Sequence, residues 1–202
     1  MSKINIFCFG FGQVAEGFIN KLIQEKKDFN LSITSRQETH QIELNNFKIT
    51  SYNFTDDKFD RSIDKKLKEA NYILISIPPI EGKDIVAKYF DKNLQGITNC
   101  KWITYLSATS VYGDHKGEWV NENSTTKPTS PNGSNRLSAE NTWKKLSNKN
   151  KYPLQIFRLA GIYSNEHNIL KRLQTGKLQV VDKKNHFFSR IHVEDVANIL
   201  FK

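Results

Sequence analysis

The spacing of apolar and polar residues along this chain is the spacing expected of alternating strands and helices. Short runs rich in β-branched and aromatic residues predict strands, and apolar side chains at helical spacing lie between several of them. Strands that alternate with helices pair in parallel, because each helix brings the chain back to the end of the sheet at which the preceding strand began. The pattern therefore predicts an α/β fold with a doubly wound parallel sheet. The predicted strands cover residues 4–9, 31–36, 47–54, 72–77, 102–106 and 154–157, and the predicted helices cover residues 13–26, 65–70, 83–90 and 136–147.

A glycine-rich turn follows the first predicted strand. Gly10, Gly12 and Ala15 have the spacing G-x-G-x-x-A at the start of a helical pattern. Gly10 permits a tight turn, Gly12 lets a pyrophosphate approach the backbone, and Ala15 keeps the helix close to the strand. The helix N-terminus adds free N–H groups and a positive dipole end. The motif predicts a dinucleotide site, with a purely structural turn as the alternative. The residues predicted to bind the dinucleotide here are Gly10, Phe11, Gly12, Gln13 and Val14.

The second predicted strand ends in Ser35 and Arg36. At this place in a dinucleotide-binding fold, an acidic residue binds the ribose 2′-hydroxyl, whereas an arginine accommodates a 2′-phosphate. The strand end carries no acidic residue, and Glu38 lies two residues beyond it. Ser35 and Arg36 therefore predict a cofactor site that prefers NADP(H) to NAD(H). The alternative is an ordinary surface arginine after a strand.

Composition and charge limit the remaining classes. The chain has 202 residues, 38% of them hydrophobic, which suits one globular domain. It has neither an apolar run of membrane-spanning length nor the features of a signal peptide, so we expect a cytoplasmic protein. The net charge of +9 is spread over helix-like segments, which favours a solvated basic surface over nucleic-acid binding. Cys8 and Cys100 are predicted to be reduced core residues, and the histidines lack metal-ligand spacing.

Three segments in the second half resemble one known family. They are Leu106-Ser-Ala-Thr-Ser-Val-Tyr-Gly-Asp114, Phe157-Arg-Leu-Ala-Gly-Ile-Tyr163 and Arg190-Ile-His-Val-Glu-Asp-Val-Ala197. Their order and spacing resemble the extended short-chain dehydrogenase/reductases, the NAD(P)-dependent epimerase/dehydratase group. The resemblance covers nearly the whole chain. It implies a Rossmann domain over residues 1–160 and the start of a small substrate lobe over residues 161–202. Family members continue for several tens of residues beyond this point, so a short or incomplete lobe is expected.

The resemblance also implies where the cofactor lies. In this family the dinucleotide crosses the carboxyl ends of the strands, and Ser76, Ile77 and Pro78 lie at the carboxyl end of one predicted strand. Ser107 and Ala108 close the next strand, and the helix beyond carries Arg136. The long polar segment 113–134 between them is predicted to be a functional loop. The implied cofactor-binding residues are Ser76, Ile77, Pro78, Ser107, Ala108 and Arg136, in addition to those of the glycine turn and the second strand end.

The family uses a Ser/Thr-Tyr-Lys triad, from which this chain departs. Ala108 stands where the Ser/Thr is expected, although Ser107 and Thr109 lie beside it. Asn132 takes the place of the tyrosine and Arg136 that of the lysine. Asparagine does not exchange a proton near neutral pH, and arginine does not act as a base. Arg136 can still bind a ribose or a phosphate.

Other residues are therefore needed for proton transfer. Tyr112 and Tyr163 follow predicted strands and are the catalytic candidates, with packing roles as the alternative; His115 in the adjoining loop is a weaker candidate. The chain is predicted to be an NAD(P)-dependent oxidoreductase or epimerase-like enzyme. Its substrate would be sugar-nucleotide-like or a small carbonyl or alcohol compound. The alternatives are a non-catalytic NAD(P)-binding regulatory or redox-sensing module and, on net charge alone, a polyanion-binding protein. The resemblance also implies a homodimer through helices 83–90 and 136–147.

Overall fold

A computed structural model describes residues 3–93, 97–177 and 187–202, and it contains a seven-stranded sheet. The strand order is β3-β4-β2-β1-β5-β6-β7, and every pairing is parallel except that of β3 with β4. The predicted doubly wound parallel sheet is confirmed. The strands are β1 (Ile4–Phe9), β2 (Phe29–Ser35), β3 (His40–Leu44), β4 (Phe47–Asn53), β5 (Tyr72–Ile75), β6 (Trp102–Ala108) and β7 (Leu154–Leu159).

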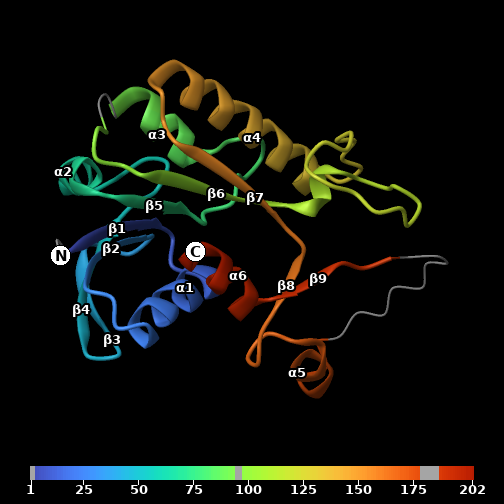
Figure 1. The fold of residues 1–202 in the computed structure, drawn as a ribbon, viewed down its shortest axis with the longest axis horizontal. Helices are drawn as coiled ribbons and strands as arrows, with labels where there is room; N and C mark the ends of the chain where they lie inside the picture. The colour runs from blue at the N-terminus through green and yellow to red at the C-terminus, as the bar shows by residue number, and fades with distance from the viewer. Residues whose placement is uncertain (1–2, 94–96, 178–186) are drawn as a thin grey trace.

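Helices cover both faces of the sheet (Figure 1). Alternate residues of β1 face opposite sides, because side chains alternate along a strand. Phe7 and Phe9 pack in one hydrophobic cluster with α2, α3 and α4, whereas Ile6 and Cys8 pack in a second cluster with α1 and α6. Each face thus has a core of its own. The helices are α1 (Gln13–Gln24), α2 (Ser62–Glu69), α3 (Ile85–Asn93), α4 (Pro131–Asn150), α5 (Ile169–Gln174) and α6 (Val193–Phe201).

Two local features differ from the sequence prediction. Residues 40–44 form an antiparallel edge strand, β3, which is joined to β4 by Asn45 and Asn46 at positive φ angles of 49° and 66°. Asparagine tolerates this conformation, which suits a tight hairpin turn. The predicted loop 113–134 is shorter, because α4 already begins at Pro131, where the Ser130 side chain accepts a hydrogen bond from the Gly133 N–H.

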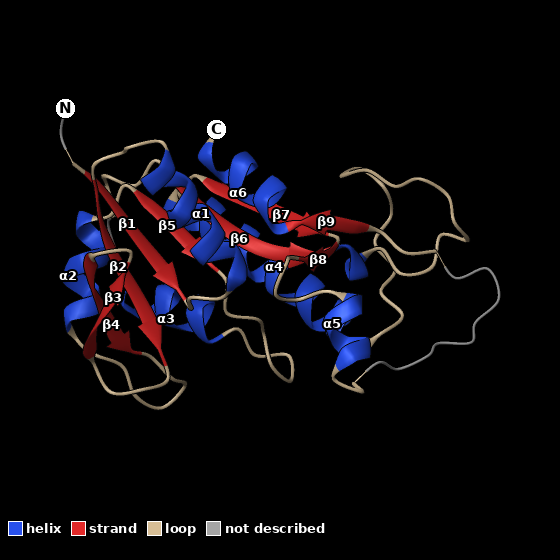
Figure 2. Ribbon diagram, turned by 90° about the horizontal axis from the view of Figure 1, so that it is seen from below, coloured by secondary structure: helices blue, strands red, loops and turns tan. Residues whose placement is uncertain are grey.

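The C-terminal part divides between two places. β8 (Gly161–Tyr163) and β9 (Arg190–His192) form a separate two-stranded parallel sheet, and α5 lies beside it (Figure 2). α6 instead packs on α1, and Val196 and Leu200 are buried in the core below the main sheet. Gly17 permits this close contact, because a Cβ there would lie 3.3 Å from the Val193 side chain. Only part of segment 161–202 therefore projects from the Rossmann layers.

Candidate functional site

The order of the strands creates a crevice beside β1. β2 pairs with one edge of β1 and β5 with the other, so the connections that follow β1 and β5 diverge at their carboxyl ends. Open α/β sheets bind their ligands at such a switch point. A cavity of about 980 Å³ lies at this place, lined by the carboxyl ends of β1, β2, β5 and β6 and by the start of α1.

The glycine turn forms the middle of the cavity wall. Gly10 has φ = +79°, and its N–H donates to Thr34 Oγ1 over 2.9 Å, which ties the turn to the end of β2. Gly12 precedes α1 with an ordinary φ of −96°, and a Cβ built there meets no protein atom within 4 Å. The space beside Gly12 and the free N–H groups of α1 suit a pyrophosphate. The residues of the turn therefore fit a dinucleotide.

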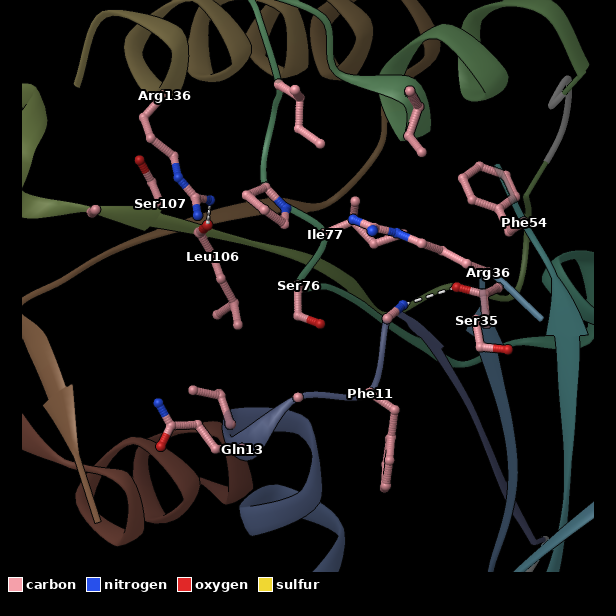
Figure 3. A pocket seen from close by; sticks show the side chains of 18 of the residues that line it. Phe11, Gln13, Ser35, Arg36, Phe54, Ser76, Ile77, Leu106, Ser107 and Arg136 are labelled. Atoms are coloured by element: carbon pink, nitrogen blue, oxygen red, sulfur yellow. Dashed lines mark hydrogen bonds between the residues drawn. The ribbon is translucent and has the colours of Figure 1, made fainter. Parts of the chain in front are cut away.

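One end of the cavity is formed by Ser35 and Arg36. The Asn53 side-chain amide donates to the backbone carbonyls of Arg36 and Gln37 over 3.1 and 2.9 Å, which fixes the chain just beyond β2. From there the Arg36 side chain extends across the cavity toward Ile77 (Figure 3). Glu38, two residues further on, contributes no lining and pairs with Lys58 over 2.6 Å.

The opposite end is formed by β6 and α4. Leu106, Ser107 and Ala108 line it together with Arg136, whose guanidinium donates a hydrogen bond to the Leu106 carbonyl. Figure 3 shows Ser107 and Arg136 at this end and Arg36 and Phe54 at the other. A ligand that spans the cavity would pass the glycine turn between the two ends.

Every residue predicted to bind a cofactor lines this one cavity. The structure also adds residues that the sequence did not predict, most of them in the segments that follow β4 and β5. Their signal in the sequence was their position at the carboxyl ends of parallel strands, where ligands bind. The predicted lining residues are Gly10, Phe11, Gly12, Gln13, Val14, Ser35, Arg36, Ser76, Ile77, Pro78, Ser107, Ala108 and Arg136, and the additional ones include Phe54, Thr55, Asp56, Ile80, Glu81, Lys83, Leu159, Ala160 and Ile162.

A buried ion pair lies behind Ser107. Glu140 on α4 is fully buried, and its carboxylate accepts a hydrogen bond from Ser107 Oγ over 2.6 Å. Arg158 on β7 donates to both carboxylate oxygens, over 2.8 Å from Nη2 to Oε2 and 3.1 Å from Nε to Oε1. Hydrogen bonding to Glu140 raises the pKa of Arg158 above its ordinary value. Nothing in the sequence pairs Glu140 with Arg158, so this ion pair could not be predicted.

The structure does not bring the two candidate tyrosines into the cavity. Tyr112 is buried, and its hydroxyl accepts a hydrogen bond from Arg158 Nη1 over 3.0 Å. Tyr163, at the end of β8, is half-exposed with its ring 5.0 Å from that of His192. Neither tyrosine lines the cavity, and neither does Asn132, which is exposed on α4. A catalytic role for Tyr112 or Tyr163 stays a prediction.

The strand order and the glycine turn together define the class of this protein. A parallel sheet that reverses its winding beside β1, with a cavity at that point and a glycine turn leading into α1, is a Rossmann-type α/β fold. Among the described residues, no helix is long and apolar enough to cross a membrane, and no cluster of side chains is arranged to hold a metal ion.

Comparison with known proteins agrees with this class. No protein-family model and no curated protein matches the sequence. A functionally unknown conserved protein from Silicibacter pomeroyi DSS has a similar structure, with 29% sequence identity and a TM-score of 0.77 over 96% of this chain and 66% of that one. The UDP-N-acetylglucosamine 4-epimerase from Methanobrevibacter ruminantium M1, solved with UDP-N-acetylmuramic acid, is 16% identical, with a TM-score of 0.72 over 98% of this chain and 72% of the enzyme.

A third similar structure contains a nicotinamide cofactor. The UDP-glucuronic acid 4-epimerase from Bacillus cereus, in complex with UDP-glucuronic acid and NAD, is 15% identical, with a TM-score of 0.72 over 95% of this chain and 70% of the enzyme. This chain thus spans 66–72% of the length of the three structures. The resemblance to the extended short-chain dehydrogenase/reductases is confirmed at the level of the fold. The structures similar to this chain include a sugar-nucleotide epimerase solved with NAD.

Proposed function

We propose that this protein binds a nicotinamide dinucleotide across the cavity and acts as an NAD(P)-dependent oxidoreductase or epimerase-like protein. The observation that carries the proposal is the open space beside Gly12, where a Cβ would meet no protein atom within 4 Å. This space adjoins the free N–H groups of α1 and lies midway between the two ends of the cavity. The pyrophosphate would lie at Gly12, the adenosine at Arg36, and the nicotinamide at Ser107.

We further propose that the cofactor is NADP(H). The Arg36 side chain leaves the end of β2 and extends across the cavity, and Ser35 beside it adds a hydroxyl. An arginine here accommodates a 2′-phosphate, whereas recognition of the free 2′-hydroxyl uses a carboxylate. Glu38, the acidic residue that follows Arg36 most closely, is paired with Lys58.

The reaction proposed is oxidoreduction or epimerisation of a sugar-nucleotide-like substrate or another small carbonyl or alcohol compound. A bound nicotinamide would supply the hydride acceptor or donor. On this chain, Arg136 donates a hydrogen bond to the end of β6 and offers further N–H groups to a ribose or phosphate. The support for this substrate class is the likeness to epimerases that were solved with UDP-sugars.

Binding and turnover test this proposal separately. Isothermal titration with NADPH and NADH measures the affinity and the preference between them. Oxidation of NADPH is then followed with a panel of carbonyl substrates that includes UDP-sugars. Tight binding of NADPH together with turnover of a member of the panel is the expected result. A folded protein that binds neither cofactor would overturn the proposal.

A second function is favoured by the chemistry of the lining. The described residues around the cavity include no tyrosine, histidine or cysteine, and their ionisable side chains are those of Arg36, Asp56, Glu81, Lys83 and Arg136. The described lining therefore lacks histidine, the side chain most often used for proton exchange near neutral pH. Tight NADPH binding without turnover would favour a non-catalytic regulatory or redox-sensing module. A homodimer through α3 and α4 stays an expectation, which the mass of the protein in solution tests.

A further inference from the structure

The hydroxyl of Ser107 has a fixed hydrogen-bonding role. Glu140 is fully buried, and its carboxylate forms an ion pair with the Arg158 guanidinium over 2.8 Å. An ionised carboxylate only accepts hydrogen bonds, and a serine hydroxyl has one proton to donate. Because Ser107 Oγ lies 2.6 Å from Glu140 Oε1, that proton is directed at Glu140. Ser107 can therefore offer only an oxygen lone pair to the cavity that it lines.

Arg136 supplies the opposite chemistry at the same end. It lies four residues before Glu140 on α4, so both side chains leave the same face of the helix. Its guanidinium donates to the carbonyl of Leu106, the residue that precedes Ser107, and it also lines the cavity. A guanidinium has five N–H donors and no acceptor, so further donors remain for a ligand. The β6 end of the cavity thus presents an acceptor beside a donor.

A primary carboxamide matches this pair, because its NH₂ group donates and its carbonyl oxygen accepts. Resting on the function proposed above, a dinucleotide with its adenosine at Arg36 and its pyrophosphate at Gly12 would extend its nicotinamide end toward Ser107, which lines the same cavity. We propose that Ser107 accepts a hydrogen bond from the nicotinamide carboxamide NH₂ and that Arg136 donates one to its oxygen. Glu140, supported by Arg158, is the positioning residue that keeps Ser107 an acceptor.

The test compares two oxidised cofactors that differ only in this group. NADP⁺ carries the carboxamide, whereas the acetylpyridine analogue of NADP⁺ has a methyl ketone that keeps the oxygen but lacks the N–H donors. Isothermal titration measures both affinities for the full chain and its variants. Because the analogue lacks the proposed hydrogen bond to Ser107, we expect the unmodified protein to bind NADP⁺ roughly three- to tenfold more tightly than the analogue. In Ser107→Ala the two affinities should become equal, within about a factor of two.

Glu140→Gln tests the positioning role. A glutamine amide can donate to Ser107 Oγ, which frees the serine proton to turn toward the cavity. The preference for NADP⁺ should then disappear or reverse, a change in ligand ratio that a merely structural loss would not produce. Ser138→Ala makes the same serine-to-alanine change on the exposed side of α4 and should leave both affinities unchanged.

The outcomes separate this inference from the proposed function. If NADP⁺ and its analogue bind the unmodified protein equally, or if Ser107→Ala keeps the preference, the carboxamide assignment is wrong while dinucleotide binding stands. If neither cofactor binds the folded protein, the proposed function fails and the assignment fails with it. Should Glu140→Gln not fold, Ser107→Ala still decides whether Ser107 contacts the amide.

Discussion

Gly10 and Gly12 lie two residues apart, yet substitutions at them should affect different properties. Gly12 has an ordinary φ of −96°, and its Cβ would point into open space, so alanine or valine there leaves the protein packing intact. Gly10 has φ = +79°, and its Cβ would lie 3.0 Å from Ile77 Cγ1 and 3.0 Å from Ser76 Oγ. We therefore expect Gly12→Val to abolish dinucleotide binding and Gly10→Ala to reduce stability.

The magnitudes follow from these contacts. A valine side chain at Gly12 would occupy the place of the pyrophosphate and so prevent its hydrogen bonds to the backbone N–H groups. Losing two such charge-assisted hydrogen bonds costs about 3–6 kcal/mol, or roughly 10²- to 10⁴-fold in affinity. The Gly12→Val change should alter the free energy of unfolding by no more than about 1 kcal/mol. Valine caps the helix less well than glycine, which destabilises the fold, but it also lowers the backbone entropy of the unfolded chain, which stabilises the fold. Alanine at Gly10 costs about 1–2 kcal/mol for the left-handed backbone alone, which lowers Tm by roughly 2–8 °C.

Two measurements check this pair of variants. Thermal unfolding by circular dichroism gives the change in Tm, and isothermal titration with NADPH gives the affinity. Gly12→Ala is the graded control, since its single methyl group should weaken binding less than valine does. A folded Gly12→Val protein that binds NADPH as tightly as the unmodified protein would refute the assigned pyrophosphate site.

Three further expectations concern the rest of the site and the core. Arg36→Ala should weaken NADPH roughly 10- to 150-fold and NADH little, because only NADPH carries the 2′-phosphate; equal losses in titration would show that Arg36 does not recognise it. If Tyr112 or Tyr163 is the predicted general acid or base, its change to phenylalanine should lower turnover about 10²–10⁴-fold; a change of less than about threefold in both variants would refute that role, since neither ring lines the cavity. Burial raises the pKa of Cys8 and of Cys100 to about 12, so both thiols stay neutral at pH 8. A disulfide reagent should label them only after unfolding, and rapid labelling of the native protein would contradict this.

The sequence by itself determined the six parallel strands of the main sheet, the helices between several of them, and the glycine turn. Each depends on local chemistry: a run such as Ile4–Phe9 alternates side chains between two buried faces, and a residue without a Cβ is needed where the chain turns left-handed at Gly10. Many residues that line the cavity could be named in advance, because the carboxyl ends of parallel strands meet at one edge whatever the side chains.

Tertiary structure alone decided which polar groups meet. Glu140 and Arg158 lie on α4 and β7, and only the packing of that helix on the sheet buries them together beside Ser107. The same packing directs the Tyr112 hydroxyl to Arg158 and leaves it outside the cavity, although its place after β6 suggested a catalytic role. A strand end specifies where a residue lies along the sheet. The direction of its side chain depends on the neighbouring elements that bury it, and this decided the chemistry at the site.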